Sequence, residues 1–68
     1  MKYNIAIKQL REKMFVTQEE LANILGVSSI TVNRWENGRF EPNIKMKKKL
    51  NDLFLKYKIN NSSFFEQV

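Results

Sequence analysis

The sequence contains no cysteine and no histidine among its 68 residues. Without cysteine the chain cannot form a disulfide, which excludes the disulfide-stapled class of small secreted proteins. The usual zinc sites take cysteine or histidine ligands, so they are excluded as well. Histidine is also the commonest general acid–base residue of enzymes. We therefore expect no catalytic residue, no metal and no cofactor.

Long apolar runs are missing too. The stretch Ile5-Ala6-Ile7 is too short for the apolar core of a signal peptide. No segment approaches the roughly 18 apolar residues of a membrane-spanning helix. The chain is long enough for one small domain, residues 1–68. These absences favour a cytoplasmic protein with no membrane partner.

Positive charge is present in excess and is unevenly placed. The 12 lysines and arginines outnumber the 7 acidic residues, which gives a formal net charge of +5. Most of the excess lies in residues 28–58, while residues 59–68 contain only one acid and no base. A basic half suits a polyanion, either a nucleic acid or an anionic membrane surface. A solvated lysine-rich face explains the charge equally well.

Apolar periodicity predicts four helices and hence an all-α bundle. The first runs from about residue 4 to residue 13, with Asn4 as its N-cap and Ile7, Leu10 and Met14 on one face. The second buries Leu21, Ile24 and Leu25. The fourth begins at the natural cap Asn43, after Pro42, and its stripe contains Met46, Leu50, Leu53, Phe54 and Tyr57. Phe64, Phe65 and Val68 suggest a short fifth helix.

A very short turn separates the second and third helices. The run Thr17-Gln18-Glu19-Glu20 fits a capping box at the start of the second helix. Gly26 ends that helix, because the residue after a helix often adopts a positive φ. Ser28 is a good N-cap for the third helix, which runs to about Glu36. Two helices joined only by Gly26 and Val27 must cross steeply, as in a helix-turn-helix.

The third helix has two different faces when its residues are placed 100° apart. One face contains Val32 and Trp35, and the other contains Ser29, Ile30, Asn33 and Arg34. Arginine can pair with guanine, asparagine with adenine, and isoleucine can contact a thymine methyl group. The polar face therefore suits the major groove of DNA. An ordinary amphipathic helix with a solvated outer face is the alternative, and Trp35 fits the core better than a stacking platform.

The same residues carry a family resemblance. It rests on Leu10-Arg11, residues 17–22, Leu25-Gly26-Val27-Ser28, residues 31–38 and Pro42. Together these segments resemble the phage repressor/Cro-type, or XRE-family, helix-turn-helix proteins. The resemblance covers residues 5–55, with the helix-turn-helix core at about 17–37. It implies a lambda-repressor-like bundle of four to five short helices.

The resemblance also implies a role for particular residues. It implies that bases are read by Ser29, Ile30, Asn33 and Arg34. It also implies that phosphates are contacted by Gln18, Ser28, Asn37, Arg39 and Lys45, and free N–H groups at helix starts support such contacts independently. Arg11 and Glu36 stand where the family often has a buried ion pair. The Lys47-Lys48-Lys49 run is more typical of a solvated face than of a specific site.

Phe15 departs from the family pattern, because many members have glycine after the first helix. Either the chain leaves this helix without a positive φ, or Phe15 packs outward. The sequence leaves both open.

These observations predict a bacterial or phage regulator that binds double-stranded DNA and is nucleoid-associated when bound. One helix-turn-helix reads few bases, so we expect a weak homodimer that binds an inverted-repeat operator and represses transcription. Residues 59–68 are expected to form a dimerisation or capping segment. The competing classes are a protein-interaction module with a protein partner, a membrane-surface module and, least favoured, an enzyme.

Overall fold

Four α-helices and no strand make up residues 3–59, the part of the chain that the computed structural model describes. The helices are α1 (Tyr3–Met14), α2 (Gln18–Leu25), α3 (Ser29–Glu36) and α4 (Ile44–Lys56). The all-α fold and the order of its helices are as the sequence predicts. The fifth helix expected around Phe64, Phe65 and Val68 falls outside the described residues.

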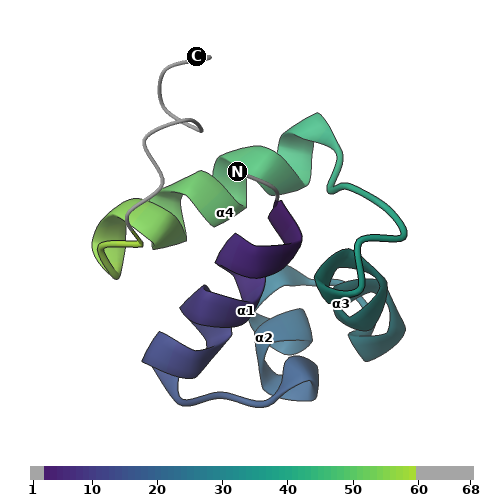
Figure 1. Ribbon diagram of the computed structural model, residues 1–68, viewed down its shortest axis with the longest axis horizontal. Helices are drawn as coiled ribbons and strands as arrows, with labels where there is room; N and C mark the ends of the chain where they lie inside the picture. Colours follow the sequence, from purple (N-terminus) through teal and green to yellow (C-terminus); the bar gives the residue numbers. More distant parts are fainter. Residues whose placement is uncertain (1–2, 60–68) are drawn as a thin grey trace.

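Helix α1 lies in the middle of the bundle (Figure 1). It contacts α3 on one side and α4 on the other, while α2 packs against α3. The core is a single cluster to which all four helices contribute. Its buried members are Ala6, Ile7, Leu10, Leu21, Ala22, Leu25, Val32, Trp35, Met46, Leu50, Phe54 and Ile59. No helix within residues 3–59 has the length and the hydropathy needed to cross a membrane.

Two details of the predicted helices are wrong. Ile24 is 53% exposed, and Ala22 is buried in its place. The face of α2 that meets α3 is centred between Leu21, Ala22 and Leu25, so Ile24 lies beyond its edge. Asn4 does not cap α1, because the helix begins one residue earlier at Tyr3.

All four helices end in the same way. A residue one or two positions after each helix has a positive φ: 57° at Phe15, 78° at Gly26, 74° at Gly38 and 56° at Lys58. The following N–H then donates to the carbonyl five residues back. The pairs are Val16 to Arg11 at 3.2 Å, Val27 to Ala22 at 2.9 Å, Arg39 to Arg34 at 3.0 Å and Ile59 to Phe54 at 2.8 Å. This Schellman-type arrangement satisfies carbonyls that a helix end leaves unpaired.

Phe15 therefore resolves the question that its sequence position raised. It adopts the positive φ at which the family often has glycine, and its side chain is 93% exposed. Of the two alternatives, outward packing is right and an exit without a positive φ is wrong. A bulky residue in the left-handed region is strained, so the position combines backbone strain with an exposed aromatic ring.

Candidate DNA-binding surface

Helix α3 presents its polar side to solvent. Ser28 caps it, and the Ser28 hydroxyl accepts a hydrogen bond from the N–H of Thr31 at 3.2 Å. Val32 and Trp35 are buried, whereas Ile30 is 62% exposed and Asn33 and Arg34 are also exposed. Ser29 is half-buried at the start of the helix. The outward face thus combines an apolar, an amide and a guanidinium side chain within two turns.

An ion pair ties this helix to α1. The Nε of Arg11 donates to Glu36 Oε2 at 2.8 Å, and its Nη2 donates to Oε1 at 3.1 Å. Only 6% of the Glu36 side chain and 21% of the Arg11 side chain are exposed. The hydrogen bond to Glu36 raises the pKa of Arg11 above its already high ordinary value. A bidentate contact of this kind fixes both the position and the orientation of the last turn of α3 relative to α1.

A chain of side-chain amides continues from the ion pair to the outer face of α3. The Gln18 amide donates to Glu36 Oε1 at 3.1 Å and accepts from Asn33 Nδ2 at 3.3 Å. Asn37 in turn donates to Asn33 Oδ1 at 3.0 Å. One amide N–H of Gln18 is thus engaged within the protein, so a phosphate contact by this residue would use its second amide N–H or its backbone N–H at the start of α2.

Asn33 keeps the hydrogen-bonding capacity that adenine requires. A side-chain amide has two N–H donors and two acceptor positions on its oxygen. Gln18 and Asn37 occupy one of each. The remaining donor and acceptor match the N7 and N6 groups that adenine presents in the major groove. The amide chain therefore holds Asn33 in place without blocking it.

Several of the basic side chains serve the fold itself. Lys13 donates to the carbonyls of Tyr57 and Lys58, both at 3.4 Å, at the C-terminal end of α4. Lys49 donates to the carbonyl of Leu25 at 3.4 Å, at the end of α2. These lysines stabilise the negative ends of helix dipoles. Sequence reasoning missed these roles, because they depend on which helix ends lie beside α4 and α1.

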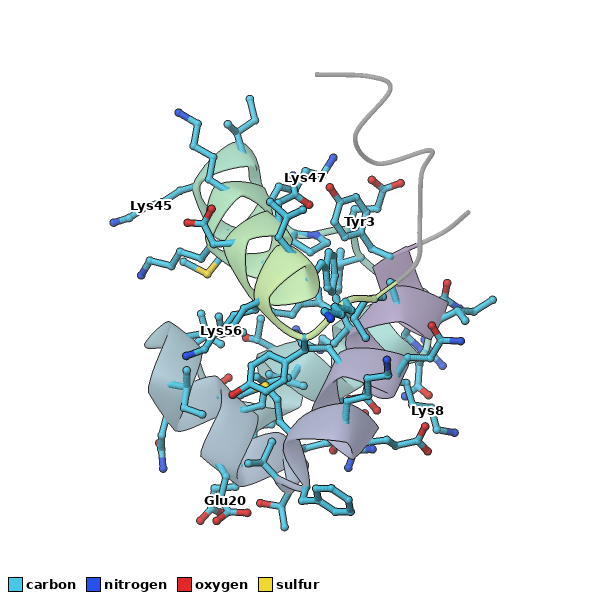
Figure 2. All side chains as sticks on the ribbon, turned by 90° about the vertical axis from the view of Figure 1, so that its left-hand side faces the viewer. Tyr3, Lys8, Glu20, Lys45, Lys47 and Lys56 are labelled. Atoms are coloured by element: carbon cyan, nitrogen blue, oxygen red, sulfur yellow. The ribbon has the colours of Figure 1, made fainter. Side chains whose placement is uncertain are left out.

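The lysines of α4 are divided between two sides of the helix. Figure 2 shows Lys45 and Lys56 projecting on one side, while Lys47 lies on the other side beside Tyr3. Lys47 forms an ion pair with Glu41 at 3.2 Å, and its Nζ lies 5.2 Å from the centre of the Tyr3 ring. Lys45 lies one turn before Lys49, on the side that faces the end of α2.

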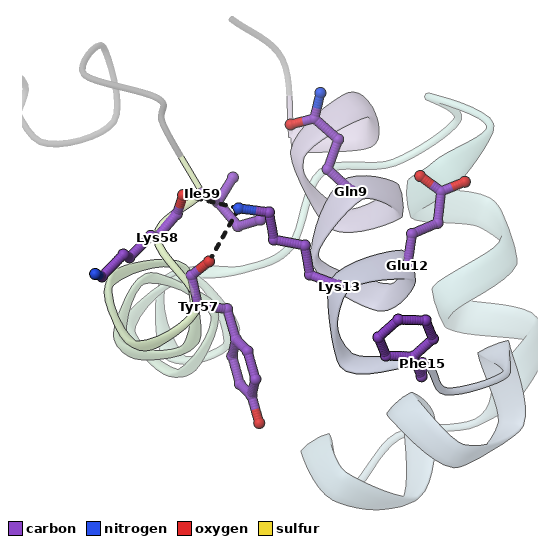
Figure 3. A pocket seen from close by; sticks show the side chains of 7 residues that line it. All are labelled: Gln9, Glu12, Lys13, Phe15, Tyr57, Lys58 and Ile59. Atoms are coloured by element: carbon purple, nitrogen blue, oxygen red, sulfur yellow. Dashed lines mark hydrogen bonds between the residues drawn. The ribbon is translucent and has the colours of Figure 1, made fainter.

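A groove opens on another part of the molecule, between the C-terminal ends of α1 and α4 (Figure 3). Its lining residues are Gln9, Glu12, Lys13, Phe15, Tyr57, Lys58 and Ile59. None of the residues predicted to contact DNA lines it. No group of three or more acidic side chains that could hold a metal ion occurs within residues 3–59.

Comparison with known proteins gives the family. A family model described as helix-turn-helix matches residues 7–54, which include all of α2 and α3. The chain belongs to the XRE-type helix-turn-helix family. Members of this family are DNA-binding transcription regulators, and the resemblance seen in the sequence is confirmed.

Two curated relatives carry this family's description. The HTH-type transcriptional activator BcrR of Enterococcus faecalis is 37% identical over 54 residues, which span 79% of this chain and 26% of the activator. An uncharacterized HTH-type transcriptional regulator of Archaeoglobus fulgidus is 40% identical over 48 residues, which span 71% of this chain and 68% of that regulator. The chain thus matches about a quarter of the length of the activator. No solved structure matches the chain.

Proposed function

We propose that this protein is a sequence-specific regulator that binds an inverted-repeat operator as a homodimer and represses transcription. The observation that carries the proposal is the outer face of α3. It presents an apolar side chain, a positioned amide and a guanidinium on one exposed helix face. These are the three chemistries that distinguish thymine, adenine and guanine in the major groove.

The proposed contacts fall into two classes. Ser29, Ile30, Asn33 and Arg34 read bases, and each good base contact contributes about 1–3 kcal/mol of discrimination. Phosphates are contacted by Gln18, Ser28, Asn37, Arg39 and Lys45. The phosphate contacts supply affinity that depends on salt but not on sequence. Such a protein acts where the DNA is, in the cytoplasm of a bacterium or of a phage-infected cell.

The size of the domain supports a dimer. Half-sites of an inverted repeat lie about 34 Å apart, one turn of DNA. The structure measures 29 × 23 × 19 Å, so two copies side by side can present their α3 helices at that spacing. We place the dimer contact in the C-terminal third of the chain. The exposed Leu55 supplies apolar surface there.

Selection from a randomised duplex library at about 150 mM salt tests the sequence specificity, because that salt suppresses weak non-specific binding. Enrichment of an inverted repeat is the expected result. No enrichment, with binding confined to low salt, would overturn the proposal and favour a protein-interaction module with a protein partner.

Two arginine variants separate the two classes of contact. Arg34→Ala should relax discrimination at one base pair, whereas Arg39→Ala should weaken binding to all duplexes alike. Titrations of the selected operator and its single-base variants measure both effects. Equal losses across all sequences for both variants would show that the roles are wrongly assigned.

A truncation tests the dimer. Ile59 is only 4% exposed and belongs to the core, so the deletion should begin at residue 60 rather than 59. Removal of residues 60–68 is expected to reduce the cooperativity of operator binding. Unchanged binding curves would contradict a dimer contact in this segment. A transcription assay with the operator across the promoter tests the sign of regulation, because repression predicts less transcript and activation predicts more.

A further inference from the structure

Phe40 is an exposed aromatic residue beside the outer face of α3. It is 59% exposed, and the guanidinium carbon of Arg34 lies 5.6 Å from the centre of its ring. We propose that Phe40 is a positioning residue that holds Arg34 in the orientation for reading a guanine. The inference rests on the proposed function and adds a specificity-determining residue to it.

The backbone brings the ring to this place. Gly38, the second residue after α3, adopts a φ of 74°, and the chain turns back along the helix. The N–H of Arg39 then donates to the carbonyl of Arg34 at 3.0 Å. Phe40 is the next residue, so its position relative to Arg34 is set by a hydrogen-bonded turn and not by a freely moving loop.

The geometry of the contact suits recognition. The contact is with the face of the Phe40 ring and involves no hydrogen bond, and the guanidinium of Arg34 donates to no group within residues 3–59. Its N–H donors therefore stay available to pair with guanine O6 and N7. The ring is also uncharged, so the positive charge of Arg34 stays available to DNA. Stacking therefore orders the side chain without competing with its base contact.

Arg11 shows the opposite arrangement on the same domain. Its Nε and Nη2 donate to Glu36 at 2.8 and 3.1 Å, and its Nη1 donates to the carbonyl of Val16 at 3.4 Å. The edge of that guanidinium is thus used within the fold. Among residues 3–59, Arg34 has a ring beneath it and no carboxylate partner. Arg11 therefore has the environment of a structural residue, whereas Arg34 has the environment expected of a residue that reads a base.

The stacking has a measurable consequence. A free arginine side chain loses considerable rotamer freedom when it binds, and ordering it in advance lowers that loss. Exposed cation–π contacts of this type correspond to an about two- to five-fold change in an equilibrium constant. Phe40→Leu should lower discrimination by that factor at one base pair, the pair at which Arg34→Ala loses its preference. Phe40→Tyr keeps a ring and should retain the wild-type discrimination.

The experiment titrates wild type and variants against the selected operator and its single-base variants. Phe15→Leu is the matched control, because it makes the same change at an exposed phenylalanine away from α3. In the Arg34→Ala background, Phe40→Leu should have no further effect at that base pair. Thermal unfolding of each variant checks that the fold is retained.

The outcomes separate the inference from the proposed function. A loss confined to the Arg34 base pair, absent in Phe40→Tyr and Phe15→Leu, supports the inference. An equal loss at all base pairs, or none, overturns it while the proposed function stands. If wild type enriches no sequence from the library, the proposed function and the inference both fail.

Discussion

Replacing Phe15 by glycine is expected to stabilise the protein. The phenylalanine has a φ of 57°, and a non-glycine residue in the left-handed region is strained by about 1–2 kcal/mol. Its ring is 93% exposed, so removing it sacrifices almost no buried surface. The stabilisation from relieving this strain is reduced by about 0.5–1 kcal/mol, because glycine has more conformational freedom in the unfolded chain than other residues. The free energy of unfolding should thus rise by about 0.5–1 kcal/mol.

For a domain of this size, 1 kcal/mol shifts the melting temperature by about 4–8 °C. The expected increase for Phe15→Gly is therefore about 2–8 °C, measured by circular dichroism at the helix band. Urea unfolding should show a higher midpoint with an unchanged slope, because the surface exposed on unfolding stays the same.

Phe15→Ala is the control that identifies the cause. Alanine removes the exposed ring as glycine does, but it keeps a Cβ and therefore the left-handed strain. Its stability should stay within about 0.5 kcal/mol of wild type. If alanine stabilises the protein as much as glycine, the gain comes from losing the ring and the backbone argument is refuted. Lys58, with a φ of 56°, offers a second position at which glycine should stabilise.

Three further changes test other parts of the structure. Gly26→Ala should destabilise by about 1–2 kcal/mol in urea unfolding through backbone strain alone, because a Cβ there meets no atom within 4 Å; a neutral effect would contradict the strain. Glu36→Gln should lower the free energy of unfolding by about 2–3 kcal/mol in the same assay. This is less than the loss usual for breaking a buried ion pair, because 21% of the Arg11 side chain is exposed. A loss under about 0.5 kcal/mol would mean that the pair only orients α3. Burial raises the pKa of Tyr3, so above about pH 10 this tyrosine ionises in the unfolded chain before it does in the folded protein, and the free energy of unfolding falls as the pH rises. Tyr3→Phe should flatten that part of the pH–stability curve. An unchanged curve would contradict the role of Tyr3.

The starts of α2, α3 and α4 could be predicted from the sequence because their capping signals are short-range. A cap and its partner lie within a few residues, as Thr17 with Glu20 and Ser28 with Thr31 show. The outer face of α3 follows from helical periodicity in the same way, and the exposed Ile30 and Asn33 lie where that periodicity puts them.

What the sequence could not provide depends on how helices lie against each other. Ile24 continues an apolar stripe, but the crossing of α2 and α3 places it outside the interface. Lys13 and Lys49 read as surface charges until the ends of α4 and α2 are found beside them. Phe40 gave no signal at all, because an aromatic residue in a loop has no periodicity. Its contact with Arg34 required the turn at Gly38 to be seen.

The amide chain from Glu36 through Gln18 to Asn33 constrains how the specificity of this domain could be redesigned. Asn33 shares hydrogen bonds with Gln18 of α2 and with Asn37 just after α3, so a new side chain there would leave both of them to find other partners. Ile30 makes no such bond and is 62% exposed. A library aimed at a new operator should therefore vary position 30 alone, but position 33 only together with 18 and 37. Changing the base read at position 33 therefore requires three residues to be varied together.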